Sequence, residues 1–176
     1  MPTSPSTIGS PKTRIEEATL LDLIKVAQNL RQSDRSELAH TRDANDALAL
    51  ANDAYYPSLF SYVASYDGEP VFAFGAIPVG RGLGLVQVWG FGTEQSPKII
   101  RGVTKFVVRY IVPRLRASGV TQAQCLIHED NFLSRRWLEF MGFQSIATLP
   151  DLGAGHEGML LYFVADNASS LHQADP

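Results

Sequence analysis

Hydrophobic positions near the start of the chain follow the spacing of a helix. A strand-like segment comes first, at Thr13–Ala18, and the apolar residues after it recur every three or four positions over 19–31. Those residues are Leu20, Leu21, Leu23, Ile24, Ala27 and Leu30. A second, shorter helix is predicted after an N-cap at Ser33 or Asp34. A third is predicted from about Asp43 to Tyr55.

The pattern then changes to that of strands. Phe60–Tyr66 and Pro70–Ile77 flank Asp67-Gly68, a dipeptide that suits a tight hairpin because both residues tolerate positive φ. A glycine-rich loop precedes another strand-like stretch, Leu85–Thr93. This part of the chain is therefore predicted to form neighbouring antiparallel strands.

The second half of the chain alternates helices and strands. A long amphipathic helix is predicted from Pro97 to Ala117, and Pro113 should bend its last turn or end it. An apolar strand at Gln122–His128 and a helix at Phe132–Met141 follow. Two last strands are predicted at about 144–148 and 158–165. Because a strand–helix–strand crossover sets its two strands parallel, this order of helices and strands predicts an α/β fold with a mixed sheet.

Length and composition fit one globular domain. The chain has 176 residues, of which 45% are hydrophobic, enough to bury a core. Residues 1–12 and 166–176 are polar and rich in residues that disfavour order, so we predict disordered tails around a single domain at 13–165. A net charge of -3 argues against general affinity for nucleic acid.

The rest of the composition points to the cytoplasm. Cys125 is the only cysteine, so no intrachain disulfide can form. The start of the chain lacks the features of a secretory signal, and no apolar run is long enough to span a membrane. Cys125 and the histidines show no metal-ligand spacing, so no metal site is predicted.

One segment resembles a known family. Asn131-Phe-Leu-Ser134-Arg-Arg-Trp137-Leu138-Glu-Phe-Met-Gly142-Phe143 resembles the signature that follows the fifth strand of the GCN5-related N-acetyltransferases (GNATs). In that signature an Asn precedes a small residue by three positions, and the helix ends in Gly-Phe. The resemblance implies the acyl-CoA N-acyltransferase fold, with six to seven strands in a central mixed sheet and helices on both faces.

A narrower resemblance extends over about 70–165. Pro70-Val-Phe-Ala-Phe-Gly75, Val88-Trp89-Gly-Phe-Gly-Thr93 and Arg136-Trp137-Leu138 are similar to a T7-type bacteriophage family of acetyltransferase-like internal virion or assembly proteins. This likeness implies a protein of the host-cell cytoplasm, with an association with the virion as a further expectation. Its partners would be phage structural or host proteins.

The GNAT resemblance also implies where acetyl-CoA would bind. Its pantetheine arm would lie along the fourth strand, at Phe91, Gly92 and Thr93. Glycines in a strand suit a close approach of a ligand, although small residues under a packed helix are an equal alternative.

The phosphates would lie at the start of the following helix, where backbone N–H groups favour anions. The residues implied there are Gln95, Lys98, Ile99 and Arg101. The family usually has Gln/Arg-x-x-Gly-x-Gly/Ala in this loop, and Lys98 and Ile100 replace its two small residues. Lys98 and Arg101 can compensate by charge, but a solvated basic helix face explains them as well.

The expected catalytic residues are incomplete. Where the family commonly places a Tyr proton donor this chain has Leu138, which cannot transfer a proton. Candidate catalytic residues are His128, Asn131 and Ser134, with Glu94 a weaker candidate for a base. A His next to Glu129 and Asp130 at a strand end is, however, more often a surface group.

Two functions are consistent with these residues. One is a catalytically degenerate bacteriophage protein that acts in virion assembly or binds a host partner. The other is an acetyl-CoA-dependent N-acetyltransferase that acts on a primary amine. The altered phosphate loop and Leu138 favour the first, and Asn131–Phe143 is compatible with both.

Overall fold

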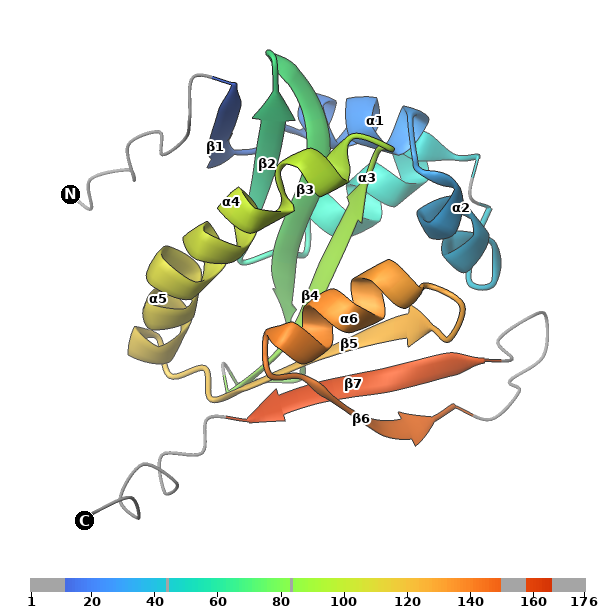
Figure 1. Cartoon of the computed structure of the whole chain (residues 1–176). Helices are drawn as coiled ribbons and strands as arrows, with labels where there is room; N and C mark the ends of the chain where they lie inside the picture. The colour runs from blue at the N-terminus through green and yellow to red at the C-terminus, as the bar shows by residue number, and fades with distance from the viewer. Residues whose placement is uncertain (1–11, 44, 83, 150–157, 166–176) are drawn as a thin grey trace, which may run out of the picture.

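A computed structural model describes residues 12–43, 45–82, 84–149 and 158–165. Seven strands form one sheet in the order β1-β2-β3-β4-β5-β7-β6 (Figure 1). The strands are β1 (Thr13–Glu17), β2 (Phe60–Tyr66), β3 (Glu69–Pro78), β4 (Leu85–Gly92), β5 (Gln122–His128), β6 (Gln144–Thr148) and β7 (Met159–Ala165). The helices are α1 (Leu20–Gln28), α2 (Gln32–Ala39), α3 (Ala47–Tyr55), α4 (Ile100–Phe106), α5 (Val112–Ala117) and α6 (Phe132–Phe140). A mixed α/β fold with helices on both faces is thereby confirmed.

The strand pairings agree with the directions predicted from the sequence. Strands β1 to β4 are antiparallel neighbours, and the β2–β3 hairpin turns at Asp67 and Gly68, with φ of 50° and 88°. Strands β4 and β5 are parallel, as the crossover between them requires. Their pairing covers only Leu85–Gln87 of β4, and from there the two strands diverge (Figure 1).

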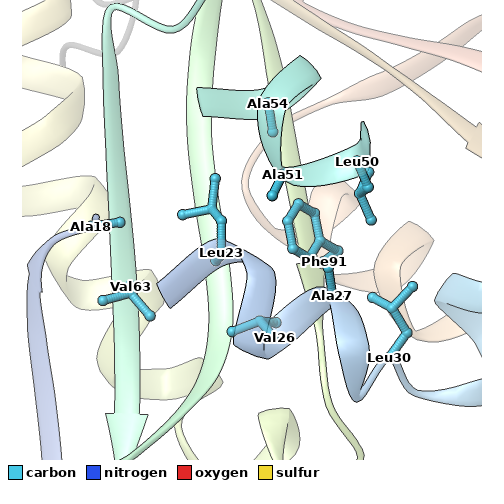
Figure 2. Packing of buried hydrophobic residues seen from close by; sticks show 11 residues of the cluster. Ala18, Leu23, Val26, Ala27, Leu30, Leu50, Ala51, Ala54, Val63 and Phe91 are labelled. Carbon is cyan, nitrogen blue, oxygen red and sulfur yellow. The ribbon is translucent and has the colours of Figure 1, made fainter. Parts of the chain in front are cut away.

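Helices cover the two faces of the sheet separately. Helices α1 and α3 pack on one face, where Leu23, Val26 and Ala51 meet Phe91 of β4 (Figure 2). On the other face Val103 and Phe106 of α4 pack against Phe72, Phe74 and other residues of β2 and β3. Helix α6 covers β5 and β7 on that same face. The diverging ends of β4 and β5 are therefore enclosed by helices on both sides.

The long helix predicted at 97–117 is divided into four parts. A 3₁₀ turn at Ser96–Lys98 precedes α4, and a π-helical turn at Val107–Ile111 joins α4 to α5. The helix does not end at Pro113, because Pro113 lies in the first turn of α5, which continues to Ala117; the bend predicted as the alternative stays a prediction. Proline has no N–H to donate, and the π turn just before it shifts the hydrogen bonds, so that the Val112 N–H donates to the Val107 carbonyl.

Other predicted boundaries moved by a few residues. Helix α2 begins at Gln32 with Arg31 at its cap position, so neither Ser33 nor Asp34 caps it. Most of the predicted tails and of the loop before β7 lie outside the described residues. Among the residues that the structure describes, no helix is long and apolar enough to cross a membrane.

Candidate functional site

A cavity of about 410 Å³ lies over the diverging strands β4 and β5. Its floor includes Val88 and Gly90 of β4 and Cys125 and Ile127 of β5. Helices α4 and α5 form one wall and α6 the other, and the lining is mostly apolar. Two polar side chains, Arg31 and Ser134, line it at the end where the strands separate most.

Helix α2 and its cap residue are hydrogen-bonded to the end of β4. The Asp34 carboxylate accepts a hydrogen bond from the Gly92 backbone N–H at 2.8 Å, and the Arg31 N–H donates to the Gly92 carbonyl at 2.8 Å. Asp34 is buried, and Arg31 pairs with it through Nε at 2.7 Å. Burial raises the pKa of Asp34 while the Arg31 guanidinium opposes that rise. The backbone N–H and carbonyl groups of Gly92 are therefore both hydrogen-bonded within the protein.

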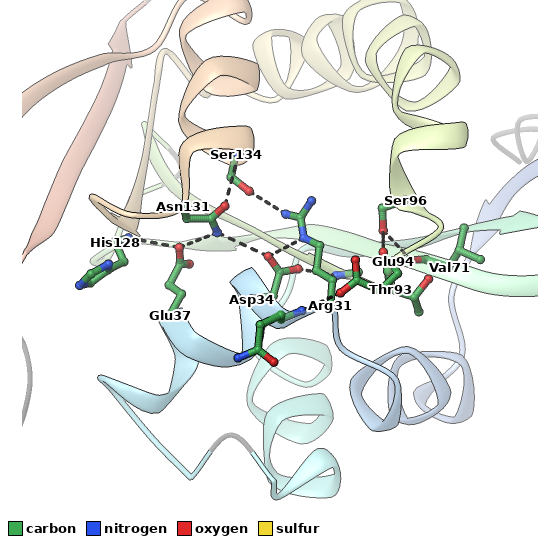
Figure 3. Close-up of polar contacts among 12 residues, drawn as sticks. Arg31, Asp34, Glu37, Val71, Thr93, Glu94, Ser96, His128, Asn131 and Ser134 are labelled. Atoms are coloured by element: carbon green, nitrogen blue, oxygen red, sulfur yellow. Dashed lines mark hydrogen bonds and ion pairs between the residues drawn. The ribbon is translucent and has the colours of Figure 1, made fainter.

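The same helix reaches the end of β5. Glu37 Oε2 accepts a hydrogen bond from the His128 backbone N–H at 3.2 Å and from Asn131 Nδ2 at 2.8 Å (Figure 3). Burial raises the pKa of Glu37 from 4.5 to about 7, although these two hydrogen bonds favour the charged form. A carboxylate with a pKa near neutrality is suited to accept a proton and release it again.

The three predicted catalytic residues lie around this network. Asn131 is buried, and its side-chain oxygen caps α6 by accepting from the Ser134 N–H. The Ser134 hydroxyl oxygen accepts from Arg31 Nη2 at 2.8 Å, which leaves the hydroxyl proton free to donate. The His128 ring stacks on His40 with centroids 4.1 Å apart, and its Nδ1 accepts from the Asp130 N–H. The network thus brings Asn131, Ser134 and the backbone of His128 together.

The residues predicted along the pantetheine arm have other contacts. The Phe91 side chain is buried on the opposite face of the sheet, against α1 and α3. The Thr93 N–H donates to the Val71 carbonyl, and a Cβ on Gly92 would overlap the Ser96 hydroxyl oxygen. Gly92 is therefore required by local packing, whereas Gly90, two residues earlier, lines the cavity.

The predicted phosphate-binding residues lie at the start of α4, where the turn is bonded to itself. The acceptors within this turn are Thr93, Gln95 and Ser96. They receive hydrogen bonds from the backbone N–H groups of Gln95, Ser96, Lys98 and Ile99. The Ile99 side chain is buried in the core under α4. Lys98 Nζ lies 4.9 Å from the centre of the Tyr66 ring, and Arg101 is exposed. Phosphate binding at these residues stays a prediction.

The structure also shows the contacts of Leu138 and Glu94, two further positions considered in the sequence. Leu138 is buried with Cys125, Ile127 and Tyr162 and also lines the cavity. Glu94 is exposed, and its Oε1 accepts from the Gln32 N–H. Among the described residues, no group of three or more His, Cys, Asp or Glu is arranged to hold a metal ion.

Sequence reasoning missed Arg31 and Glu37, and it took Asp34 only as a possible N-cap. Their signal is a spacing of three residues, which puts them on one side of a helical segment. A solvated helix face has the same pattern. The distinction lies in the partners, which are 58 to 103 residues away in the sequence.

Solved structures of acetyltransferases have the same fold. A putative acetyltransferase aligns at 17% identity over 94% of this chain and 89% of its own, with a TM-score of 0.63. AAC(6')-Ib, solved with ribostamycin and coenzyme A, aligns at 19% identity over 94% and 99%, with a TM-score of 0.61. The yncA protein from Salmonella typhimurium, a putative acetyltransferase solved with acetyl-CoA, aligns at 13% identity over 93% and 99%, with a TM-score of 0.60.

The acetyltransferase fold predicted from the Asn131–Phe143 segment is thereby confirmed. No protein-family model and no curated protein matches the chain. The narrower resemblance to a bacteriophage family stays a prediction.

Proposed function

We propose that the protein is an N-acyltransferase that takes an acyl group from an acyl-CoA such as acetyl-CoA and passes it to a primary amine. The observation that carries this proposal is the cavity over the diverging strands, with Arg31 and Ser134 at its polar end. Glu37 is hydrogen-bonded to the end of β5, through the His128 backbone N–H. Coenzyme A bound to a structure of the same fold supports the choice of donor.

The cavity suits the thioester end of an acyl-CoA. Pairing of β4 with β5 ends at Gln87. The peptide groups of Val88 and Gly90 lie on the same strand edge as those of Gly92, because backbone direction alternates along a strand. Gly90 has no side chain to project into the cavity beside that edge, and apolar residues surround it. An acyl-CoA bound there would supply a thioester, which is activated toward amines.

Each polar group has a role that follows from its contacts. Glu37 is the general base, because a carboxylate with a pKa of about 7 can take a proton from an incoming ammonium group. Arg31 Nη2 and the Ser134 hydroxyl are hydrogen-bond donors at the polar end of the cavity, where negative charge develops on the acyl oxygen. Asn131 positions Glu37.

Calorimetric titration of the full chain with CoA and acetyl-CoA tests the proposal. We expect saturable binding of both, and we expect Val88→Trp, which fills the cavity, to abolish it. Leu126→Trp is the matched control, because Leu126 of β5 is 38% exposed and does not line the cavity. Absence of binding to a folded wild-type chain would reject the proposal.

A second candidate function is a non-catalytic protein of a bacteriophage that acts in virion assembly or binds a host partner. Two observations favour it. Leu138 stands where the family commonly has a proton donor, and the turn before α4 uses its own N–H groups. This candidate predicts that CoA does not bind and that a protein partner does. Co-purification from phage-infected cells, with the Val88→Trp variant as control, would identify such a partner.

A further inference from the structure

The cavity continues well past its polar end. It follows β5 from Ile127 back to Gln122, a span of roughly 17 Å at about 3.3 Å per residue. We call the part beyond Cys125 the distal half. Its lining includes the apolar residues Val112, Leu115, Val120, Ala123, Phe143 and Val164, with the polar residues Arg116, Thr121 and Gln122 at its far end. The distal half is thus mostly apolar, with polar residues only at its far end, and it lies at the opposite end of the strands from Arg31.

Small side chains keep the distal half open. Ala123 and Val164 face each other across the β5–β7 pairing, and Val120 precedes β5. The wall opposite comes from the π-helical turn and α5, which contribute Val107, Ile111 and Leu115. Helices α4 and α6 are joined by the hydrogen bond from Trp137 Nε1 to Thr104 Oγ1 at 2.9 Å, on the polar side of this region.

From its polar end the cavity extends in two directions. Toward the start of α4 the cavity is lined by Ser96, Pro97 and Ile100, beside the predicted phosphate site. In the other direction it runs under Trp137 and Leu138 into the distal half. A thioester held near Arg31 and Ser134 therefore has space on both sides of its carbonyl group. One side suits the pantetheine arm and the other suits the acyl chain.

We propose that the acyl group of the donor is an aliphatic chain longer than acetyl, and that this chain occupies the distal half of the cavity. This inference rests on the proposed function, since it names the donor used at the same site. Burying each additional CH₂ group strengthens binding by about fourfold, equivalent to ~0.8 kcal/mol. Hexanoyl-CoA and octanoyl-CoA should therefore bind at least tenfold more tightly than acetyl-CoA.

The test is calorimetric titration of the wild-type chain with CoA and with its acetyl, butyryl, hexanoyl and octanoyl thioesters. We expect affinity to increase along this series. Ala123→Phe, which fills the distal half, should remove the increase and leave acetyl-CoA binding unchanged. Leu126→Phe on the opposite face of β5 is the matched control and should behave like wild type.

The outcomes separate this inference from the proposed function. If acetyl-CoA binds and octanoyl-CoA binds no more tightly, the inference is overturned and the proposed function stands. If neither CoA nor any thioester binds, both are rejected. The wild-type series decides these cases even if Ala123→Phe fails to fold. An increase that persists in folded Ala123→Phe would place the chain outside the distal half and would also overturn the inference.

Discussion

The carboxylate of Glu37 accepts a hydrogen bond from the backbone N–H of His128, 91 residues further along the chain. This bond joins α2 to the end of β5. Asp34, one helical turn earlier, makes the matching bond to Gly92 at the end of β4. Helix α2 thereby spans the two strand ends between which the proposed reaction takes place, and it supplies a carboxylate with a pKa of about 7 (Figure 3).

Replacing Glu37 by Gln should remove the proposed general base. Gln retains an oxygen that can accept from His128 and Asn131, so we expect acyl-CoA affinity to stay within about twofold of wild type. The transfer rate should fall by roughly 100- to 10,000-fold. Wild-type kcat should rise as pH passes about 7, because the base must be deprotonated, and the variant should lose this dependence. A variant with the wild-type rate and pH profile would exclude Glu37 as the base.

The raised pKa of Glu37 should also make stability depend on pH. Between pH 4.5 and about 7 the folded chain keeps a proton that the unfolded chain has released. The free energy of unfolding therefore falls as pH rises through this window, by on the order of 3 kcal/mol in total. The raised pKa of Asp34 acts in the same direction.

Urea unfolding from about pH 4 to pH 8, compared between wild type and Glu37→Gln, measures this effect. The variant should have the higher free energy of unfolding at about pH 8. The difference between the two proteins should decrease as pH falls. Equal slopes in both proteins would contradict the assignment.

Replacing Asn131 by Ser should raise the pKa of Glu37 further. The hydrogen bond from Asn131 is the largest influence that lowers this pKa, and Ser cannot replace the amide donor. Ser still caps α6, so the helix should keep most of its stability. Carboxyl ¹³C NMR titration follows the Glu37 pKa directly. Asn29→Ser at the end of α1 is a control with the same substitution elsewhere, and an equal shift there would refute the coupling.

Replacing Leu138 by Tyr tests the missing proton donor. Leu138 lines the cavity, so a phenol there can protonate a departing thiolate. We expect slow transfer by wild type and a gain of tenfold or more in Leu138→Tyr. Overpacking should cost about 1–3 kcal/mol of stability. Leu138→Phe adds the same ring without the hydroxyl, and an equal gain in that variant would show that the effect is not proton donation.

Reversing the charges of Lys98 and Arg101 tests the predicted phosphate site. The double variant Lys98→Glu, Arg101→Glu should bind acyl-CoA at least tenfold more weakly, with the largest loss at low salt. Lys25→Glu, Arg81→Glu changes net charge equally, and neither residue lines the cavity. Unchanged affinity in the first double variant would remove Lys98 and Arg101 from the site.

Local patterns determined much of the fold. Positive φ at Asp67 and Gly68 depends on neighbouring residues, so the sequence predicts it correctly. Hydrophobic periodicity likewise predicted the seven strands and their order along the chain. Periodicity shows which face of an element is apolar but carries less information about how a helix is divided, and the π turn before Pro113 was not predicted.

Only the tertiary structure decided what the polar residues do. In the sequence, Arg31, Asp34 and Glu37 have the pattern of a solvated helix face. Their burial, and the pKa of about 7 at Glu37, depend on Gly92, His128 and Asn131. The cost of burying a charge and the hydrogen bonds that offset it are set by distances in space. The sequence therefore determined the elements and their order, and the packing of α2 against the ends of β4 and β5 decided which polar side chains are buried between them.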